Sequence, residues 1–431
     1  MNEVFRDRAK LYFKEKADDF LELLKQEATQ GFFLNTRKAE REEILKEIDF
    51  PIETSELTND SFYHNEDNIG KTRAYELGLI YPQEIAASLT VRYAAMEKVK
   101  VIVDLCAAPG GKTIGIMNRM NDDSICISND VNHTRAQILS SNLERLGLDQ
   151  AIVTSKEVSE LADQLEDCAD LVILDAPCSG EGMIRKYPEI LEQYSLKNIS
   201  DLSSIQKDLL RSAYRILKKG GQLIYSTCTY AQEEDEDQVL SFLKDYPDMK
   251  MVKLPKIGDP VLEGTIKLSP LNGTEGQFIC LMKKDGDPDN THIKLLKTVK
   301  DRTVEAFLKE NLDLNEYYLY AYKDRFYLSL SPLPDLGTHV LRYGICVGEL
   351  KNGRPEPSHS LYRANSLIGR YRYSYDLNPE EYDRYIQGLE LKVPLKNGFY
   401  QVTYHGHSLG FGKLSNGTLK NKYPKGLRRV I

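Results

Sequence analysis

The spacing of apolar residues predicts a helical start to the chain. Residues 3 to 28 carry apolar side chains at helical intervals, namely Ala9, Phe13, Ala17, Phe20 and Leu24. The stretch GFFLNTRK, residues 31 to 38, is typical of a strand and leads into a second, highly charged helix. Together these segments predict a small N-terminal α+β unit, which we place at residues 1 to 65.

From about residue 98, short β-rich runs alternate with helical patterns. The runs are VIVDL, SICIS, AIVTS, LVILDAP, QLIYSTC and QFICLM, and the helical segments include TRAQILSSNLERLG and SSIQKDLLRSAYRILKKGG. This alternation predicts a parallel, doubly wound α/β sheet, whose ligands gather at the carboxyl ends of the strands. We assign residues 66 to 285 to this domain.

After Lys284, the run DGDPDN predicts a linker into a third region, residues 286 to 431. This region is rich in tyrosine, since 15 of the 26 tyrosines lie beyond residue 316. We expect most of these rings to pack in a core and a minority to be available for stacking on bases.

Composition narrows the class of protein. The chain has 431 residues, is 41% hydrophobic and lacks an apolar run of the roughly 20 residues that a membrane span needs. Its first residues, MNEVFRDRAK, are charged, so we expect no secretory signal and a cytoplasmic protein. The seven cysteines include no C-x-x-C pair, which favours reduced thiols. His405 and His407 are too isolated for a metal site, so we expect no metal.

The net charge of −8 hides an asymmetry along the chain. Residues 341 to 431 carry 15 Lys or Arg against 7 Asp or Glu. The last twenty residues have no acid and six basic side chains, namely Lys413, Lys420, Lys422, Lys425, Arg428 and Arg429. A basic face of this kind attracts phosphate backbones, although a basic tail is also often a solvated end.

The first strand of the α/β domain runs into DLCAAPGGKT, residues 104 to 113. A Walker A loop is excluded because the position of its first glycine is Cys106, and no G-x-G-x-x-G is present. A methyltransferase-type loop for S-adenosylmethionine remains, and Asp130 in ISND can accept hydrogen bonds from both ribose hydroxyls. The predicted cofactor-binding residues here are Cys106, Ala107, Ala108, Pro109, Gly110, Gly111, Lys112 and Asp130.

Two further motifs place a cysteine at the end of a predicted strand. LDAPCSGEG contains Cys178 and YSTCTY contains Cys228, so both thiols are expected at the carboxyl edge of the sheet. The side chains of Cys106, Cys126 and Cys280 lie in apolar strand contexts and are expected to be small core residues.

The motifs VDLCAAPGGKT, LDAPCSGEGMIRK and YSTCTY, in this order in one α/β domain, resemble the NOP2/Sun family of RNA cytosine-5 methyltransferases. The ending SLGFGKLSNGTLKNKYPKGLR is similar to the C-terminal domain of RsmF-type bacterial members, and FFLNTRK and ELGLIYPQEIAASL match the segments upstream. The resemblance implies a Rossmann-like class I methyltransferase domain and a β-rich, PUA-like C-terminal RNA-binding region. It also implies methyl transfer from S-adenosylmethionine to 16S ribosomal RNA or the small subunit by a protein expected to act as a monomer.

The resemblance also assigns roles to the thiols. C5 of cytosine is a poor nucleophile, so a thiolate must first add to C6, and a base must later remove the C5 proton. By analogy with the family, Cys228 makes the covalent attack and Cys178 serves breakdown of the adduct. Asp175 can hold the amino and N3 edge of the cytosine, and it also belongs to the predicted cofactor site. Lys112 is a candidate for stabilising charge at the C2 carbonyl, although it could also be a plain surface lysine.

Several alternatives stay open at this point. Glu157 follows the third strand where relatives often carry an Asn or Asp for the adenine amino group, and it is our candidate for that contact. The acidic run EEDED, residues 233 to 237, is typical of a helix N-terminus, with a supporting role in the site as the alternative. A transfer RNA methyltransferase, a methyltransferase acting on DNA or an amine, and a non-catalytic assembly factor are competing functions. The sequence Asp-Ala-Pro-Cys favours attack through a thiol over amine methylation.

Overall fold

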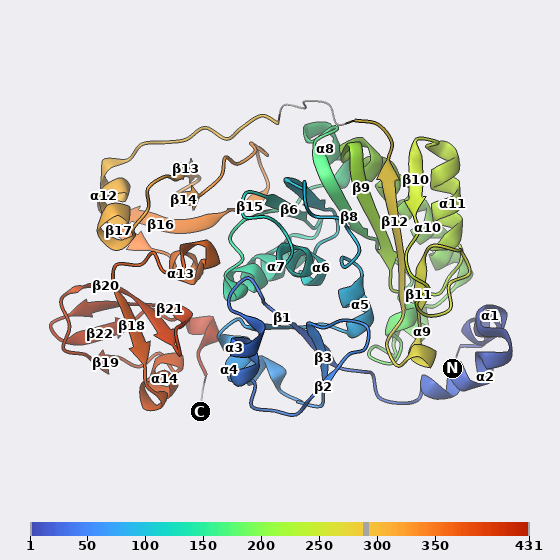
Figure 1. The fold of residues 1–431 in the computed structure, drawn as a ribbon, viewed down its shortest axis with the longest axis horizontal. Helices are drawn as coiled ribbons and strands as arrows, with labels where there is room; N and C mark the ends of the chain where they lie inside the picture. Colours follow the sequence, from blue (N-terminus) through green and yellow to red (C-terminus); the bar gives the residue numbers. More distant parts are fainter. Residues whose placement is uncertain (1, 288–292, 430–431) are drawn as a thin grey trace.

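The N-terminal unit combines helices with a small antiparallel sheet. The computed structural model describes residues 2–287 and 293–429 (Figure 1). The linker expected at residues 285 to 290 lies partly outside them, because 288 to 290 are not described. The N-terminal sheet has the order β2-β3-β1-β4. Its unit consists of α1 (Glu3–Phe13), η1 (Lys14–Lys16), α2 (Ala17–Leu23), β1 (Gly31–Leu34), α3 (Arg41–Lys46), β2 (Ile52–Thr54), β3 (Ser61–His64), η2 (Ile69–Lys71), α4 (Arg73–Glu76) and β4 (Ile80–Pro82).

The middle of the chain forms the predicted doubly wound sheet, which is thereby confirmed. Strands β5 to β9 are parallel in the order β9-β8-β5-β6-β7, and β12 continues the sheet antiparallel to β9. Its elements are α5 (Ile85–Leu89), β5 (Val101–Asp104), α6 (Gly111–Met117), β6 (Ile125–Asn129), α7 (His133–Leu146), β7 (Ala151–Thr154), α8 (Val158–Gln164), β8 (Ala169–Asp175), η3 (Glu181–Met183), α9 (Ile190–Gln193), α10 (Leu196–Ile216), β9 (Leu217–Thr227), α11 (Glu236–Asp245), β10 (Met249–Val252), β11 (Ile266–Leu268), η4 (Pro270–Asn272) and β12 (Gln277–Lys284).

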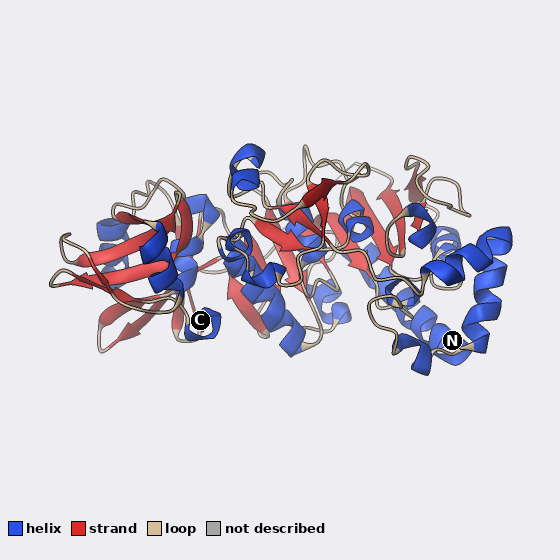
Figure 2. Cartoon of the chain, turned by 90° about the horizontal axis from the view of Figure 1, so that it is seen from below, coloured by secondary structure: helices blue, strands red, loops and turns tan. Residues whose placement is uncertain are grey.

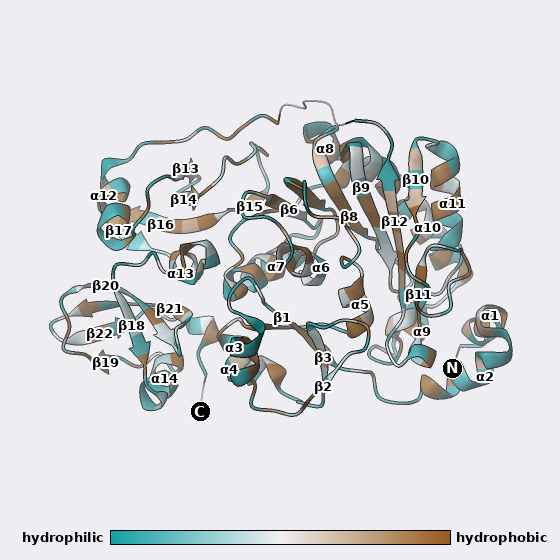
Figure 3. Ribbon diagram, viewed as in Figure 1, coloured by the Kyte–Doolittle hydropathy of each residue, from teal (hydrophilic) through white to brown (hydrophobic). Residues whose placement is uncertain are grey.

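Helices cover both faces of this sheet. One hydrophobic core joins its strands to α8, α10 and α11, and another joins them to α5, α6 and α7. Figure 3 shows the consequence, since the strands are hydrophobic and the outer sides of the helices are polar. Local signals fix the ends of these helices. The Asn132 side chain caps α7 at its start, and Gly147, with φ +73°, ends it.

One predicted segment differs from the structure. The sequence pattern predicts that the helix continues through LKKGG, residues 217 to 221. In the structure α10 ends at Ile216 and these five residues begin β9. Gly220 has φ +75°, a left-handed backbone that a helix cannot continue through. Pairing of Leu217 with Ala169 on β8 then takes the place of the helical hydrogen bonds.

The C-terminal region contributes two sheets of its own and one strand to the central sheet. The sheets have the orders β13-β14-β16-β17 and β18-β20-β21-β22-β19, while β15 pairs antiparallel with β7. The elements are α12 (Arg302–Asn311), β13 (Tyr318–Tyr322), β14 (Arg325–Ser329), β15 (Val340–Tyr343), β16 (Ile345–Lys351), β17 (Arg354–Pro357), α13 (His359–Arg363), η5 (Asn365–Leu367), β18 (Ser374–Leu377), α14 (Pro379–Ile386), β19 (Leu391–Lys392), β20 (Gly398–Tyr404), β21 (His407–Ser415), β22 (Thr418–Asn421) and η6 (Lys425–Leu427).

These units pack on one another along an elongated molecule (Figure 2). One core contains side chains of the N-terminal sheet, such as Phe32 and Phe62, together with Tyr382 and Tyr385 of α14 and Val402 of β20. Tyrosines of the C-terminal region are largely core residues, as predicted, and the buried ones are Tyr320, Tyr327, Tyr343, Tyr362, Tyr382, Tyr385, Tyr400, Tyr404 and Tyr423.

Candidate active site

The predicted site residues gather at the carboxyl edge of the central sheet. Strands β5, β6, β8 and β9 run parallel, so the residues that follow them emerge on the same side. Asp175 is the last residue of β8 and pairs in register with Ser226 of β9. This register brings the loops that contain Cys178 and Cys228 next to each other.

The two thiols are in contact. The Sγ atoms of Cys178 and Cys228 lie 3.3 Å apart, and both side chains are partly accessible. The hydrogen bond to Cys228, together with burial, raises the pKa of the Cys178 thiol well above its ordinary value. The Cys178 thiol therefore resists ionisation more strongly than an exposed cysteine does.

Lys112 and Asp175 form an ion pair beside the thiols. Lys112 Nζ lies 2.7 Å from Asp175 Oδ2, and Ser226 Oγ donates to Asp175 Oδ1 at 2.6 Å. Burial opposes the charge on Lys112, but the negative charge of Asp175 and the hydrogen bond to it raise the pKa of Lys112 on balance. Lys112 is therefore a stable cation in the site, and its interpretation as a plain surface lysine does not hold.

The loop between β5 and α6 is held by surrounding side chains and backbone. Ala107 N donates to Asn129 O at 2.8 Å, and Asn142 Nδ2 donates to Pro109 O at 2.9 Å. At Gly111 an added Cβ would lie 2.0 Å from Gln83 Oε1, so the Gln83 side chain covers this glycine. Cys106 is half-buried in this loop, whereas Cys126 and Cys280 are buried as predicted.

Two buried carboxylates at this edge have oxygen atoms free to accept hydrogen bonds. Asp130 Oδ1 accepts from Asn132 N, whereas Oδ2 lies 3.4 Å from Arg135 Nη1 and has no hydrogen-bond partner among the described residues. Asp104 accepts from Thr113 through Oδ2, and its Oδ1 likewise lacks a partner in the described part of the chain. Burial raises the pKa of Asp104 to about 7. Unsatisfied buried acceptors of this kind fit a ligand that donates hydroxyl or amino hydrogens.

Glu157 lies at the end of β7, on the same edge of the sheet. It is exposed at the N-cap of α8, where its side chain makes no capping hydrogen bond. Its neighbour Lys156 is buried and forms an ion pair with Glu160. Contact of Glu157 with an adenine ring stays a prediction.

The acidic run 233 to 237 begins a helix, as predicted, and its member Asp235 is buried beside the Cys228 loop. Glu236 and Asp237 occupy the first turn of α11, as predicted. Asp235 accepts from Thr227 Oγ1 at 2.5 Å and lies 2.9 Å from Lys267 Nζ. Burial raises the pKa of Asp235 to about 8. This side chain therefore ties the Cys228 loop to the end of β9 and to β11.

Other buried acids of the site went unrecognised in the sequence. Glu181, in the turn after Cys178, is fully buried. Arg185 and Glu275 form an ion pair with side chains 5% and 3% exposed, and Glu275 Oε1 also accepts from Thr29 N at 2.8 Å. The sequence offers one signal for these acids. Glu181 in SGEG and Glu275 in GTEG each lie in a glycine-containing turn, where a charged side chain often has a specific partner.

The N-terminal helices pack directly on the two thiol loops. Phe5 and Phe20 share a hydrophobic core with Ile184 and Tyr230, and Phe20 meets the Tyr230 ring edge-on at 5.3 Å. Arg8 also forms an ion pair with Glu233 at 2.5 Å. The hydrophobic contacts place α1 and α2 beside the thiol loops, on the lower right of Figure 1, whereas the Arg8–Glu233 pair lies at the surface.

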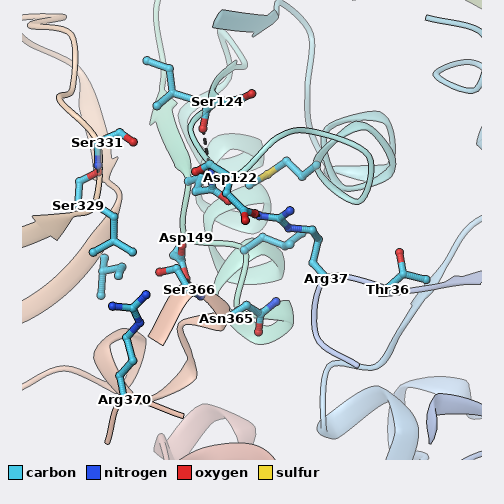
Figure 4. Close-up of a pocket in the computed structure, with 17 residues that line it drawn as sticks. Thr36, Arg37, Asp122, Ser124, Asp149, Ser329, Ser331, Asn365, Ser366 and Arg370 are labelled. Atoms are coloured by element: carbon cyan, nitrogen blue, oxygen red, sulfur yellow. Dashed lines mark hydrogen bonds and ion pairs between the residues drawn. The ribbon is translucent and has the colours of Figure 1, made fainter. Parts of the chain in front are cut away.

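A polar pocket of about 400 Å³ lies elsewhere in the molecule (Figure 4). It is lined by Arg37, Asp122, Asp149, Gln150 and Arg370, among others. Ser124 and Ile125 in its wall stand at the start of β6, so the pocket is at the amino edge of the sheet, opposite the thiols. It is a junction between three parts of the chain, distinct from the candidate active site.

Four of the six basic side chains near the C-terminus have partners among the described residues. Lys422 pairs with Glu356, Arg429 pairs with Glu76 and Arg428 donates to Tyr423 O. Lys413 Nζ lies over the Phe399 ring, 5.1 Å from its centroid. Lys413 and Lys420 are exposed and stand directly opposite each other on β21 and β22. Like charges opposite each other destabilise a sheet, so this pair favours an anionic partner.

The described residues contain neither a helix suited to span a membrane nor a cluster of side chains suited to bind a metal ion. Within residues 2–287 and 293–429, no helix has the length and apolarity needed to cross a bilayer. No group of three or more His, Cys, Asp or Glu in that part of the chain is arranged to hold a metal ion. His405 Nδ1 instead lies 2.6 Å from Glu47 Oε1.

Comparison with known proteins gives matches along most of the chain. Family models match residues 93–283 (16S rRNA methyltransferase RsmB/F), 1–85 (N-terminal domain of 16S rRNA methyltransferase RsmF) and 372–429 (methyltransferase RsmF PUA domain). The ribosomal RNA small subunit methyltransferase F of Escherichia coli O139:H28 is 26% identical, over 96% of this chain and 93% of that protein.

Solved structures agree on the fold. A methyltransferase homologue from Pyrococcus horikoshii is 26% identical, with a TM-score of 0.59 over 66% of this chain and 95% of that one. NSun6 from the same organism, solved with SFG, is 22% identical with a TM-score of 0.59 over 65% of this chain and 98% of that one. With the Rossmann-like sheet, the thiol pair and the three matched segments in place, this chain belongs to the RsmF-type 16S rRNA methyltransferases, a family of S-adenosylmethionine-dependent RNA methyltransferases.

Proposed function

We propose that this enzyme transfers a methyl group from S-adenosylmethionine to C5 of a cytosine in 16S ribosomal RNA, through a covalent adduct between Cys228 and C6. The contact between the Cys178 and Cys228 sulfur atoms at 3.3 Å, beside the Lys112–Asp175 ion pair, carries the proposal. A single base in this space can be reached by a nucleophile, a second thiol and a cation at once.

The chain offers suitable partners for S-adenosylmethionine, which supplies the methyl group when bound. The unpartnered Oδ2 of Asp130 fits a ribose hydroxyl. The loop from Cys106 to Gly111 would hold the cofactor through its backbone, and Glu157 and Asp175 complete the proposed set. The structure of NSun6 with SFG supports a cofactor site in a fold of this kind.

Covalent catalysis would then proceed in balanced steps. The Cys228 thiolate would add to C6, and the π electron pair of the C5–C6 bond would then form a bond from C5 to the methyl carbon. The bond between that carbon and the donor sulfur would break at the same time, with S-adenosylhomocysteine as the leaving group. Asp175, hydrogen-bonded at the N3 and amino edge, and Lys112 near the C2 oxygen favour this addition by stabilising charge on the ring. Loss of the C5 proton to a base then expels the Cys228 thiolate. Cys178, whose sulfur atom lies 3.3 Å from that of Cys228, is assigned to this breakdown step.

Access to the base requires the RNA to be held from outside the pocket. A paired or stacked cytosine has to be turned out of its helix, which costs about a few kcal/mol. Lys413 and Lys420, exposed and opposite each other, are suited to contact phosphates at a distance from the target.

The test is methylation of small-subunit ribosomal RNA that lacks the modification. Free RNA and assembled subunits are incubated with the protein and methyl-labelled S-adenosylmethionine, and the nucleosides are separated by mass spectrometry. We expect labelled 5-methylcytidine from at least one of the two substrates. A label in another nucleoside, or label only in transfer RNA offered in parallel, would refute the proposed chemistry or the proposed substrate, respectively.

A further inference from the structure

Two buried glutamates join the loops that contain the thiols, and they do so reciprocally. Glu181, in the loop after Cys178, accepts a hydrogen bond from Tyr230 N of the other loop at 2.9 Å. Glu234, in the loop after Cys228, accepts from Ser179 N at 3.0 Å. Each carboxylate therefore crosses to a backbone N–H within two residues of the opposite cysteine.

Further contacts surround this crossed pair, which we call the glutamate clasp (Glu181 and Glu234). The Tyr194 hydroxyl donates to Glu181 Oε1, and Gln206 Nε2 donates to Glu234 Oε2 at 2.8 Å. The same Gln206 amide also donates to Pro177 O at 2.9 Å, immediately before Cys178. Gly182 N donates to Cys228 O at 2.9 Å, which adds a direct backbone link between the loops.

The clasp is costly to bury, which argues that it has a purpose beyond packing. Both glutamates are 0% exposed, and burial is the main cause that raises the pKa of each. Oε1 of Glu234 has no hydrogen-bond partner among the described residues. A buried carboxylate is tolerated only when specific donors compensate it, and apolar residues would fill the same space at lower cost.

We propose that Glu181 and Glu234 are positioning residues that keep the sulfur atoms of Cys178 and Cys228 in contact, so that both thiols reach one cytosine. When two side chains act on one substrate, each has to be held within about 0.5 Å of its productive position. Neither loop is a regular element around its cysteine, so hydrogen bonds across the loops have to supply this precision. The inference rests on the proposed two-thiol reaction.

Substitutions separate positioning from general stability. Glu181→Ala and Glu234→Ala remove the acceptors, whereas Glu181→Gln and Glu234→Gln keep an oxygen that can accept the same N–H. Glu181→Asp and Glu234→Asp keep the charge, but their side chains are one methylene too short to reach the N–H of the other loop. They replace an alanine variant in the test if that variant does not fold. Glu233→Ala is the matched control, because Glu233 adjoins Glu234 but pairs outward with Arg8.

The first measurement is the rate at which diamide links Cys178 to Cys228 in the full-length protein without RNA. Two thiols lose two protons and two electrons to the N=N bond of diamide, and peptide mass spectrometry identifies the disulfide. We expect the alanine and aspartate variants to form it at least about tenfold more slowly than wild type, since hydrogen bonds to charged groups contribute on that order. The glutamine variants and Glu233→Ala should stay within about twofold of wild type. Alanine and aspartate variants that react at the wild-type rate would overturn the proposal.

The second measurement is single-turnover methylation of 16S RNA. A displacement of about 1 Å can reduce a positioned reaction by about a hundredfold. We therefore expect a lower single-turnover rate constant in the alanine variants, with the RNA concentration for half-maximal rate unchanged, and recovery in the glutamine variants. If disulfide formation depends on the clasp but the wild type makes no 5-methylcytidine, the proposed function fails while the positioning role stands.

Discussion

Lys112 Nζ and Asp175 Oδ2 lie 2.7 Å apart, although the two residues belong to different motifs. Lys112 lies in the first turn of α6, at the end of the predicted cofactor loop, and Asp175 ends β8 before Cys178. The ion pair therefore links the residues proposed to hold the methyl donor with those proposed to hold the base. Methyl transfer needs the two substrates in one fixed geometry, and this contact is a direct physical connection between their sites.

Binding of S-adenosylmethionine should depend on Asp130. Its buried Oδ2 lies 3.4 Å from Arg135 Nη1 but accepts no hydrogen bond from the described residues, so ribose hydroxyls are the expected donors. Loss of hydrogen bonds to a charged group costs about 1.5–3 kcal/mol. We therefore expect Asp130→Ala to raise the Kd for S-adenosylmethionine at least about tenfold in isothermal titration calorimetry, with Glu160→Ala as the control. Equal affinity in wild type and Asp130→Ala would place the ribose elsewhere.

Glu275 should be a major contributor to stability near the site. Its ion pair with Arg185 is almost completely buried, and it also accepts from Thr29 N. Removal of one partner leaves an uncompensated buried charge, at a cost of about 3–5 kcal/mol. Glu275→Ala should lower the free energy of unfolding in urea by that amount, while Arg185→Met/Glu275→Leu should lose less than the single change. A cost below about 1 kcal/mol for Glu275→Ala would contradict this account.

Asp104 should make the protein less stable as the pH rises. Burial raises its pKa to about 7 in the folded protein, above the ordinary value of 3.8, so the folded state binds its proton more tightly. The stability that this proton provides is present below about pH 4 and is lost as the pH rises through about 7. Asp104→Asn keeps an acceptor for Thr113 but cannot ionise. The variant should therefore gain stability over wild type at pH 8 compared with pH 5, and an equal difference at both pH values would argue against burial as the cause.

RNA binding should depend on the exposed lysine pair of the last sheet. Lys413 and Lys420 face each other across β21 and β22, whereas Lys422 is paired with Glu356. Each lost phosphate contact reduces the slope of log K against log salt by about 1. Lys413→Gln/Lys420→Gln should thus reduce the slope by about 2 in filter-binding or anisotropy titrations, and Lys422→Gln should change it less. An unchanged slope in the double variant would place the RNA on another face.

The sequence predicted the central sheet and its motifs well, because hydrophobic period and turn residues are local signals. Strands such as VIVDL and LVILDAP are buried on both sides and were therefore recognisable, and the parallel order placed Cys178 and Cys228 at one edge. The end of α10 was missed because LKKGG continues a helical pattern, whereas pairing with β8 decides its conformation.

Contacts between distant segments were beyond prediction. Packing of α1 and α2 on the thiol loops, and pairing of β15 with β7, join residues more than 150 positions apart. Glu181 gave no signal that its partner was Tyr230, since reciprocal hydrogen bonds between loops follow from the register of β8 and β9. The sequence shows that the C-terminal segment is basic. It does not show which of these side chains form ion pairs, because partners such as Glu76 and Glu356 are distant in the sequence.

The division of labour between the thiols is the central claim, and trapping of the covalent adduct tests it most directly. Wild type, Cys178→Ala, Cys228→Ala and the double variant are each mixed with unmodified 16S RNA and S-adenosylmethionine, and denaturing gels then separate protein–RNA adducts from free protein. We predict that Cys178→Ala accumulates an adduct, that Cys228→Ala and the double variant form none, and that mass spectrometry locates the link at Cys228. An adduct that persists without Cys228, or one that accumulates only when Cys228 is replaced, would contradict the account.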